Sequence, residues 1–163
     1  GAEGLGEGVI WVGRWVDVTG VTVEKVFGKL YEHCVALEGM LLKAGMVLTG
    51  KDAAQQAEVE EVAEATLRCL RRAVPAAVPG LVFLSGGQSD VAATERMNAI
   101  CRADNLPWKV SFSFGRALQD AALKTWRGSA DNVARAQGAL HHRAKCNSLA
   151  TPGRYSEQAE SET

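Results

Sequence analysis

The segment Gly80-Leu-Val-Phe-Leu-Ser-Gly-Gly-Gln-Ser-Asp90 decides the fold class of this chain. Its first five residues are glycine or apolar residues, and they predict a buried β-strand. A Ser-Gly-Gly turn then leads to Ser89, whose residue type favours a helix N-cap, and we expect the helix to continue to about Arg102. A buried strand that passes directly into a helix is the repeating unit of parallel α/β folds.

The same alternation of strand and helix extends along the rest of the chain. Segments rich in β-branched, aromatic or apolar residues predict strands at 9–18, 35–43 and 108–114. Apolar spacing and helix-ending residues predict helices at 23–33, 58–74, 117–127 and 130–147. Strand and helix thus alternate about four times, whereas a closed (β/α)₈ barrel needs about 250 residues. We therefore expect a parallel half of a TIM barrel, whose open sheet edges are completed by a partner or by dimerisation.

Composition limits the classes of partner. With 163 residues, of which 47% are hydrophobic, the chain is long enough for one domain with its own core. A net charge of -1 provides no field that would attract nucleic acid or an anionic membrane. No apolar run approaches the roughly 20 residues needed to span a bilayer. We expect a cytoplasmic protein with a flexible lead-in at 1–8, a domain at 9–150 and a frayed acidic tail at 151–163.

Cysteine and histidine spacing gives no metal-binding signature. The four cysteines lack a C-x-x-C pair and are expected to be reduced core residues. His141 and His142 are adjacent, so on a helix they point about 100° apart and cannot chelate one ion together. We therefore assign no metal site and no cofactor.

Lys43 lies in an apolar stretch, between Met40-Leu-Leu42 and Met46-Val47. Burial of an ammonium group is costly, so a buried lysine is favoured as a neutral amine, which is a nucleophile that forms Schiff bases with carbonyl substrates. The alternative is that the aliphatic stem packs while the ammonium group reaches water. The stretch considered alone favours this alternative.

Three groups are predicted at the carboxyl ends of successive strands, where parallel barrels place their active sites. They are Lys43, the turn that contains Ser85 and Gly86, and the pair Gly115-Arg116. Glycines at a strand-to-helix junction allow a phosphate to reach backbone N–H groups, and an arginine can add bidentate contacts. Each signal alone is weak, because a Ser-Gly-Gly turn is more often only a turn and an arginine after a strand is usually a solvated charge. Together they indicate an enzyme that binds a phosphorylated ketone or aldehyde and forms an imine with it.

Three longer stretches resemble the class I, Schiff-base fructose-bisphosphate aldolases: Leu37-Glu-Gly-Met-Leu-Leu-Lys43, Phe83-Leu-Ser-Gly-Gly-Gln-Ser-Asp90 and Ser113-Phe-Gly-Arg-Ala-Leu-Gln119. The resemblance covers roughly 27–155 and corresponds to the C-terminal half of the family. It implies a glycolytic lyase that cleaves fructose 1,6-bisphosphate to dihydroxyacetone phosphate and glyceraldehyde 3-phosphate. It also implies that Lys43 forms the imine and that a substrate phosphate is held by Ser85, Gly86, Gly115 and Arg116.

The N-terminal segment departs from the family pattern. Where the family has a strand resembling Val-Pro-Ile-Val-Glu-Pro-Glu, this chain has Val9-Ile-Trp-Val-Gly-Arg-Trp15, so the two carboxylates fall on Gly13 and Trp15. Two interpretations follow. The first is an aldolase that acts on a phosphorylated sugar but needs its missing half, supplied by a homo-oligomer or a complementary half-barrel. The second is a non-catalytic half-barrel that serves as an interaction or assembly module.

Overall fold

The computed structural model describes residues 12–50 and 52–161, and the predicted lead-in at 1–8 lies outside them. The chain divides into two compact units. The first unit contains α1 (Val12–Glu32) and α2 (Val59–Ala73). The second contains α3 (Asp90–Cys101), α4 (Arg116–Trp126), α5 (Val133–Ala150) and α6 (Glu157–Ser161). Each of the three strands begins in the first unit and ends in the second.

The strands β1 (Leu41–Ala44), β2 (Gly80–Phe83) and β3 (Lys109–Phe112) form one sheet in the order β1-β2-β3. At the start of β3, the Lys109 N–H donates to the carbonyl of Pro79, which directly precedes β2. At the end of β1, the Ala44 carbonyl accepts from the N–H of Leu84, which directly follows β2. Strand starts thus lie beside strand starts, and strand ends beside strand ends. The sheet is therefore parallel, as predicted, and it is not closed into a barrel. The described residues supply three strands rather than the four that we expected.

Gly80 allows the strands to approach closely at the start of β2. A Cβ atom at this position would lie 2.9 Å from Cδ2 of Leu41 and 3.3 Å from the Lys109 carbonyl oxygen. The Leu41 atom is the end of a flexible side chain and can move, but the Lys109 oxygen belongs to the backbone, so an added Cβ would require a shift of a few tenths of an ångström between β2 and β3. Close packing against β1 and β3 therefore explains why a glycine suits the first position of β2.

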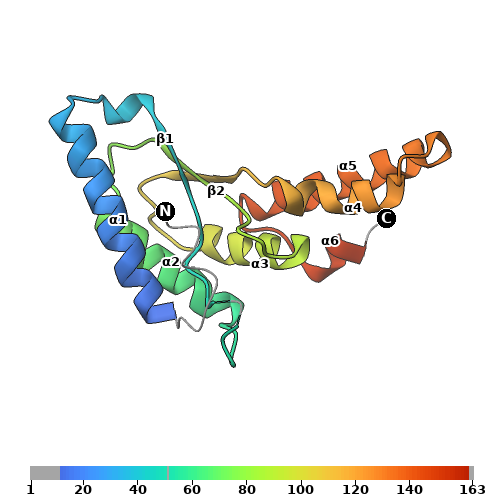
Figure 1. Ribbon diagram of the computed structural model, residues 1–163, viewed down its shortest axis with the longest axis horizontal. Coiled ribbons are helices and arrows are strands. Elements are labelled where there is room, and N and C mark those ends of the chain that lie inside the picture. The colour runs from blue at the N-terminus through green and yellow to red at the C-terminus, as the bar shows by residue number, and fades with distance from the viewer. Residues whose placement is uncertain (1–11, 51, 162–163) are drawn as a thin grey trace. The chain divides into compact units, whose positions relative to one another are not determined.

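The N-terminal strand prediction is wrong where the structure can be compared with it. Residues 12–18, predicted as part of a strand at 9–18, belong to the 21-residue helix α1, and residues 9–11 lie outside the described part of the chain. Val16 and Phe27 are buried on this helix, and the Cys69 thiol donates to the Val16 carbonyl at 3.5 Å. Figure 1 shows α1 and α2 side by side. Packing against α2 therefore outweighs the β-propensity of the valines and tryptophan.

The strand predicted at 35–43 is shorter in the structure. Leu37–Gly39 forms a single 3₁₀ turn, η2, in which Leu37 is buried, and β1 begins only at Leu41. Apolar character alone did not distinguish a turn with one buried leucine from a strand in this stretch. The strand does include Lys43.

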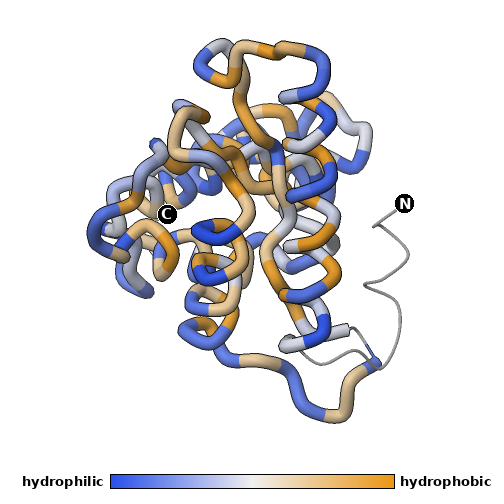
Figure 2. The backbone as a smooth tube through the Cα atoms, turned by 90° about the vertical axis from the view of Figure 1, so that its left-hand side faces the viewer, coloured by the Kyte–Doolittle hydropathy of each residue, from blue (hydrophilic) through white to orange (hydrophobic). Residues whose placement is uncertain are grey.

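The helices of the second unit agree with the sequence. Ser89 caps α3, because its Oγ accepts from the Ala92 N–H at 3.2 Å. The helix expected at 130–147 is a short 3₁₀ turn, η3 (Ala130–Asn132), followed by α5. α5 packs on both α3 and α4, and Figure 2 shows hydrophobic and hydrophilic residues alternating in bands along the helical turns. None of the described helices is both long and apolar enough to cross a membrane.

The segment after residue 150, predicted as a frayed tail, contains the helix α6. Arg143, whose side chain is 2% exposed, donates from Nη1 and Nη2 to the Glu160 carboxylate at 2.5 and 2.8 Å, and the Tyr155 hydroxyl donates to the same carboxylate at 2.7 Å. Burial alone would raise the pKa of Glu160, but these hydrogen bonds outweigh it and lower that pKa. Burial and the bond to Glu160 together raise the pKa of Tyr155. These contacts hold α6 against α5.

Candidate functional site

The predicted site residues lie at or just after the ends of strands whose backbones are joined by hydrogen bonds. Leu84 N–H donates to the Ala44 carbonyl at 3.0 Å, so Lys43 and Ser85 are each one residue from this bond. On the other side of β2, Ser113 N–H donates to the Phe83 carbonyl at 2.8 Å, two residues before Gly115. The five predicted residues all belong to the second compact unit. Their backbones therefore lie at the carboxyl edge of the parallel sheet, as expected for such a fold.

Lys43 is exposed, which agrees with the alternative in which its ammonium group reaches water and not with its burial. Leu41, on the same face of β1, is also 62% exposed. The reason is that β1 is an outer strand of an open sheet, and no described element covers this face. Within the described residues the Lys43 amine has no hydrogen-bond or ion-pair partner. The amine is therefore accessible to a solute, and no described residue buries it.

The turn after β2 presents backbone donors. Ser85 is buried, and its carbonyl accepts from both the backbone N–H and the side-chain amide of Gln88, at 3.1 and 2.7 Å. Gly86 and Gly87 have φ angles of 60° and 81°, in the left-handed region that glycine adopts without strain. Both glycines are exposed, and their N–H groups have no partner among the described residues. The turn can therefore donate to an anion.

The second half of the expected phosphate cradle is the start of α4. Gly115 is the N-cap, and its carbonyl accepts from Leu118 N–H and Gln119 N–H, each at 3.1 Å. Arg116 is the first residue of the helix and is exposed, and the first turn contains no acidic residue. A helix N-terminus with an adjacent guanidinium group favours an anion. The geometry is compatible with the predicted role.

The positions that the family pattern would fill with carboxylates have a different use in this chain. Gly13 and Trp15 lie in the first turns of α1, not in a strand. The Trp15 indole N–H donates to the Met46 carbonyl at 3.4 Å, so it contacts the loop after β1 instead of supplying a proton-transfer group. The sequence comparison placed these residues on a strand and missed this contact. A tryptophan alone gives no signal for its hydrogen-bond partner 31 residues away.

Parallel strands, helices between them, and a lysine and two glycine-containing segments at the strand ends place this chain in the class of parallel α/β proteins. The family model of fructose-bisphosphate aldolase class-I matches residues 2–163. The chain therefore belongs to the class I fructose-bisphosphate aldolase family. The resemblance found in the sequence is confirmed.

Individual relatives agree with this assignment. A probable fructose-bisphosphate aldolase class 1 of Xanthomonas axonopodis is 51% identical over 140 residues, which are 85% of this chain and 42% of the relative. A chloroplastic fructose-bisphosphate aldolase of Pisum sativum is 49% identical over 160 residues, 98% of this chain and 46% of the relative. The structure of the Plasmodium falciparum fructose-bisphosphate aldolase in complex with TRAP and a small-molecule inhibitor superposes with a TM-score of 0.90 at 44% identity, covering 93% of this chain and 44% of that one. The chain thus spans less than half the length of these relatives.

Proposed function

We propose that this chain supplies the lysine and the phosphate-binding part of a Schiff-base aldolase site for fructose 1,6-bisphosphate. The main support is the hydrogen-bonded pairing of the strand ends that carry Lys43 and Ser85, in a chain of the aldolase family. Lys43 is the nucleophile of this proposal. Ser85, Gly86, Gly115 and Arg116 bind one substrate phosphate through hydroxyl, backbone amide and guanidinium groups.

The chemistry follows from the properties of an amine. The Lys43 nitrogen adds to the ketone carbon, and loss of water gives a protonated imine. The imine accepts the electron pair of the breaking carbon–carbon bond, so glyceraldehyde 3-phosphate leaves and an enamine remains on the lysine. Protonation of the enamine carbon and hydrolysis of the imine then release dihydroxyacetone phosphate and regenerate the amine.

Cleavage also requires a base that takes the proton of the neighbouring hydroxyl group. The family's carboxylates are replaced by Gly13 and Trp15, and neither side chain can perform this step. General acid–base catalysis typically contributes about 10² to 10⁴ in rate. We therefore expect imine formation by this chain to be easier to detect than turnover, unless another chain supplies the base.

Borohydride trapping tests the proposal. The protein is incubated with dihydroxyacetone phosphate and sodium borohydride, which reduces an imine to a stable secondary amine, and the modified lysine is located by peptide mass mapping. We expect one modified site, Lys43, and no adduct in Lys43→Arg. The matched control is Lys109→Arg. Lys109 is also an exposed strand lysine, but it is the first residue of β3 and lies at the amino edge of the sheet, away from the candidate site at the carboxyl edge. Adducts distributed over surface lysines, or unchanged in Lys43→Arg, would exclude the proposed nucleophile.

A second candidate function is that of an assembly module, and it is favoured by the exposed outer strand. Leu41 and Lys43 lie on one uncovered face of β1, where an apolar residue in water favours association. Sedimentation should then show a dimer or larger species that Leu41→Glu weakens. Leu123→Glu, at a similarly exposed position on α4, is the control and should not change association. A monomer at all concentrations would contradict this function.

A further inference from the structure

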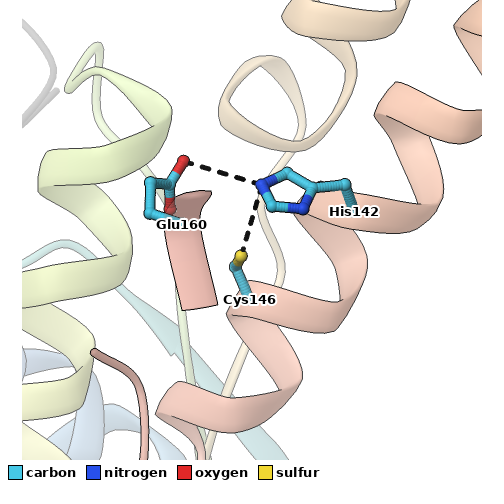
Figure 3. Close-up of side chains that lie close together, drawn as sticks. All are labelled: His142, Cys146 and Glu160. Carbon is cyan, nitrogen blue, oxygen red and sulfur yellow. Dashed lines mark hydrogen bonds and ion pairs between the residues drawn. The ribbon is translucent and has the colours of Figure 1, made fainter. Parts of the chain in front are cut away.

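Three potential metal ligands converge between α5 and α6. His142 and Cys146 are four residues apart on α5, and Glu160 reaches them from α6, as Figure 3 shows. The His142 Nε2 atom lies 3.7 Å from the Cys146 Sγ and 3.9 Å from Oε1 of Glu160. The three donor atoms all lie within 4.8 Å of one another. The three residues belong to the second compact unit, outside the predicted aldolase site.

These distances are close to those of a tetrahedral zinc site. Zinc binds histidine nitrogen at about 2.0–2.1 Å and cysteine sulfur at about 2.3 Å. Tetrahedral angles would then separate nitrogen from sulfur by about 3.6 Å and nitrogen from oxygen by about 3.3 Å. The observed 3.7 Å between nitrogen and sulfur is longer by about 0.1 Å and the observed 3.9 Å between nitrogen and oxygen by about 0.6 Å, while sulfur and oxygen lie within 4.8 Å, so Glu160 must move toward the other two ligands. Rotation of side chains on helices that are already packed is sufficient for such adjustments.

Burial and donor type favour the same ion. Cys146 is fully buried, whereas the His142 and Glu160 side chains are 25% and 28% exposed. An ion can therefore approach from the histidine and carboxylate side, and it would displace the proton of the buried Cys146 thiol, which donates to the Ala159 carbonyl at 3.5 Å. Thiolate and imidazole ligands favour zinc over the hard cations calcium and magnesium, which prefer oxygen ligands.

Glu160 already accepts hydrogen bonds from Arg143 and Tyr155. Partners of this kind orient a ligating carboxylate, but the guanidinium charge also opposes the charge of the ion. His142 lies 3.9 Å from Oε1, the oxygen that also accepts from Nη1 of Arg143. The carboxylate is thus fixed where it faces the histidine. The positive neighbour predicts an affinity below that of zinc sites made of cysteines alone.

We propose that His142, Cys146 and Glu160 form a three-ligand site for Zn²⁺, with the fourth position open to water. Binding replaces the Cys146 thiol proton by the metal and releases that proton to solvent. The sequence contains a signal for this pair, because a histidine and a cysteine four residues apart share one helix face. This site does not depend on the proposed aldolase function.

Titration with cobalt tests the proposal, because Co²⁺ occupies zinc sites and, unlike Zn²⁺, absorbs visible light. The full chain is first treated with a chelator, and Co²⁺ is then titrated while thiolate-to-cobalt absorption is followed; Zn²⁺ is added last. We expect one equivalent of Co²⁺ to bind, with a thiolate band that Zn²⁺ abolishes. Absence of saturable binding would overturn the proposal.

Matched variants separate the site from adventitious thiol binding. His142→Ala should weaken cobalt binding by at least about tenfold, since one of the few protein ligands is lost. His141→Ala changes the adjacent exposed histidine, and Cys34→Ser removes the exposed thiol. Both variants should bind Co²⁺ with the same affinity as the unsubstituted protein. Cys146→Ala should abolish the thiolate band, with circular dichroism confirming that the variant is folded. Loss of the band in Cys34→Ser, or normal binding in His142→Ala, would contradict the assignment.

Discussion

The backbone N–H of Leu84 donates to the carbonyl oxygen of Ala44 at 3.0 Å, and this bond fixes the register between β1 and β2. Side chains alternate between the two faces of a strand, so a shift of one residue would turn Lys43 to the opposite face. The proposed nucleophile therefore depends on backbone pairing beside it. The following experiments test the site and the fold that positions it.

Replacement of Arg116 should weaken phosphate binding without removing the nucleophile. In Arg116→Ala, the dihydroxyacetone phosphate concentration that gives half-maximal borohydride trapping should rise about 10- to 150-fold, because a hydrogen bond to a charged group contributes about 1.5–3 kcal/mol. The adduct at saturation should remain on Lys43. Lys124→Ala removes a cation from the last turn of the same helix and should have no effect. Equal effects of both variants would indicate general electrostatics instead of a specific contact.

Alanine substitutions at two glycines should have opposite effects on stability. Gly86→Ala forces a side chain into φ of 60° and places its Cβ 3.4 Å from Cδ1 of Leu84, so the free energy of unfolding should fall by about 1 kcal/mol. Gly28→Ala lies within α1, where no atom is within 4 Å of the added Cβ, and helix propensity should raise the free energy of unfolding by about 0.5–1 kcal/mol. Thermal unfolding followed by circular dichroism measures both shifts. A stabilised Gly86→Ala would show that the left-handed turn is not required.

Removal of the Glu160 charge should release α6. Glu160→Gln leaves the buried Arg143 guanidinium without its counter-charge, and we expect a loss of about 2–3 kcal/mol in the free energy of unfolding. Glu157→Gln changes an exposed carboxylate at the start of the same helix and serves as the control. Hydrogen exchange at the amides of α6 should accelerate only in Glu160→Gln. Equal exchange in the two variants would show that the ion pair does not hold the helix.

Cysteine alkylation should separate exposed from buried thiols, which corrects the expectation that the cysteines all lie in the core. Cys34 is exposed and should react first at pH 8. Burial raises the pKa of Cys101 to about 11, so its thiolate is scarce at pH 8 and its alkylation should accelerate as the pH rises toward 11. Site-resolved mass spectrometry gives both rates. Persistence of the fast phase in Cys34→Ser would contradict the assignment.

Local signals predicted the parts of the fold that local interactions determine. The apolar strand at Gly80, the two turn glycines and the Ser89 cap lie within one continuous stretch, and the structure has the expected strand, turn and helix there. The strand-end residues of the candidate site follow from the same alternation. Their roles in binding and catalysis stay predictions.

Errors occurred where distant residues decide the outcome. The N-terminal valines form a helix because Val16 and Phe27 are buried in the unit that contains α2, which no local pattern encodes. The tail folds because Glu160 pairs with Arg143, 17 residues earlier in the chain. The exposure of Lys43 is not among these errors, because the stretch considered alone already favoured an ammonium group in water, as on this face of an outer strand.

The exposure of Lys43 gives the chain an internal reporter of barrel completion. In a closed (β/α)₈ barrel, one face of every strand lines the filled interior, out of reach of bulky reagents. An acylating reagent should therefore label Lys43 readily in the isolated chain. A complementary half-barrel that covers this face of β1 would protect that one amine while labelling of Lys109 continued, so a chemical footprint could identify the correct partner before any activity is measured.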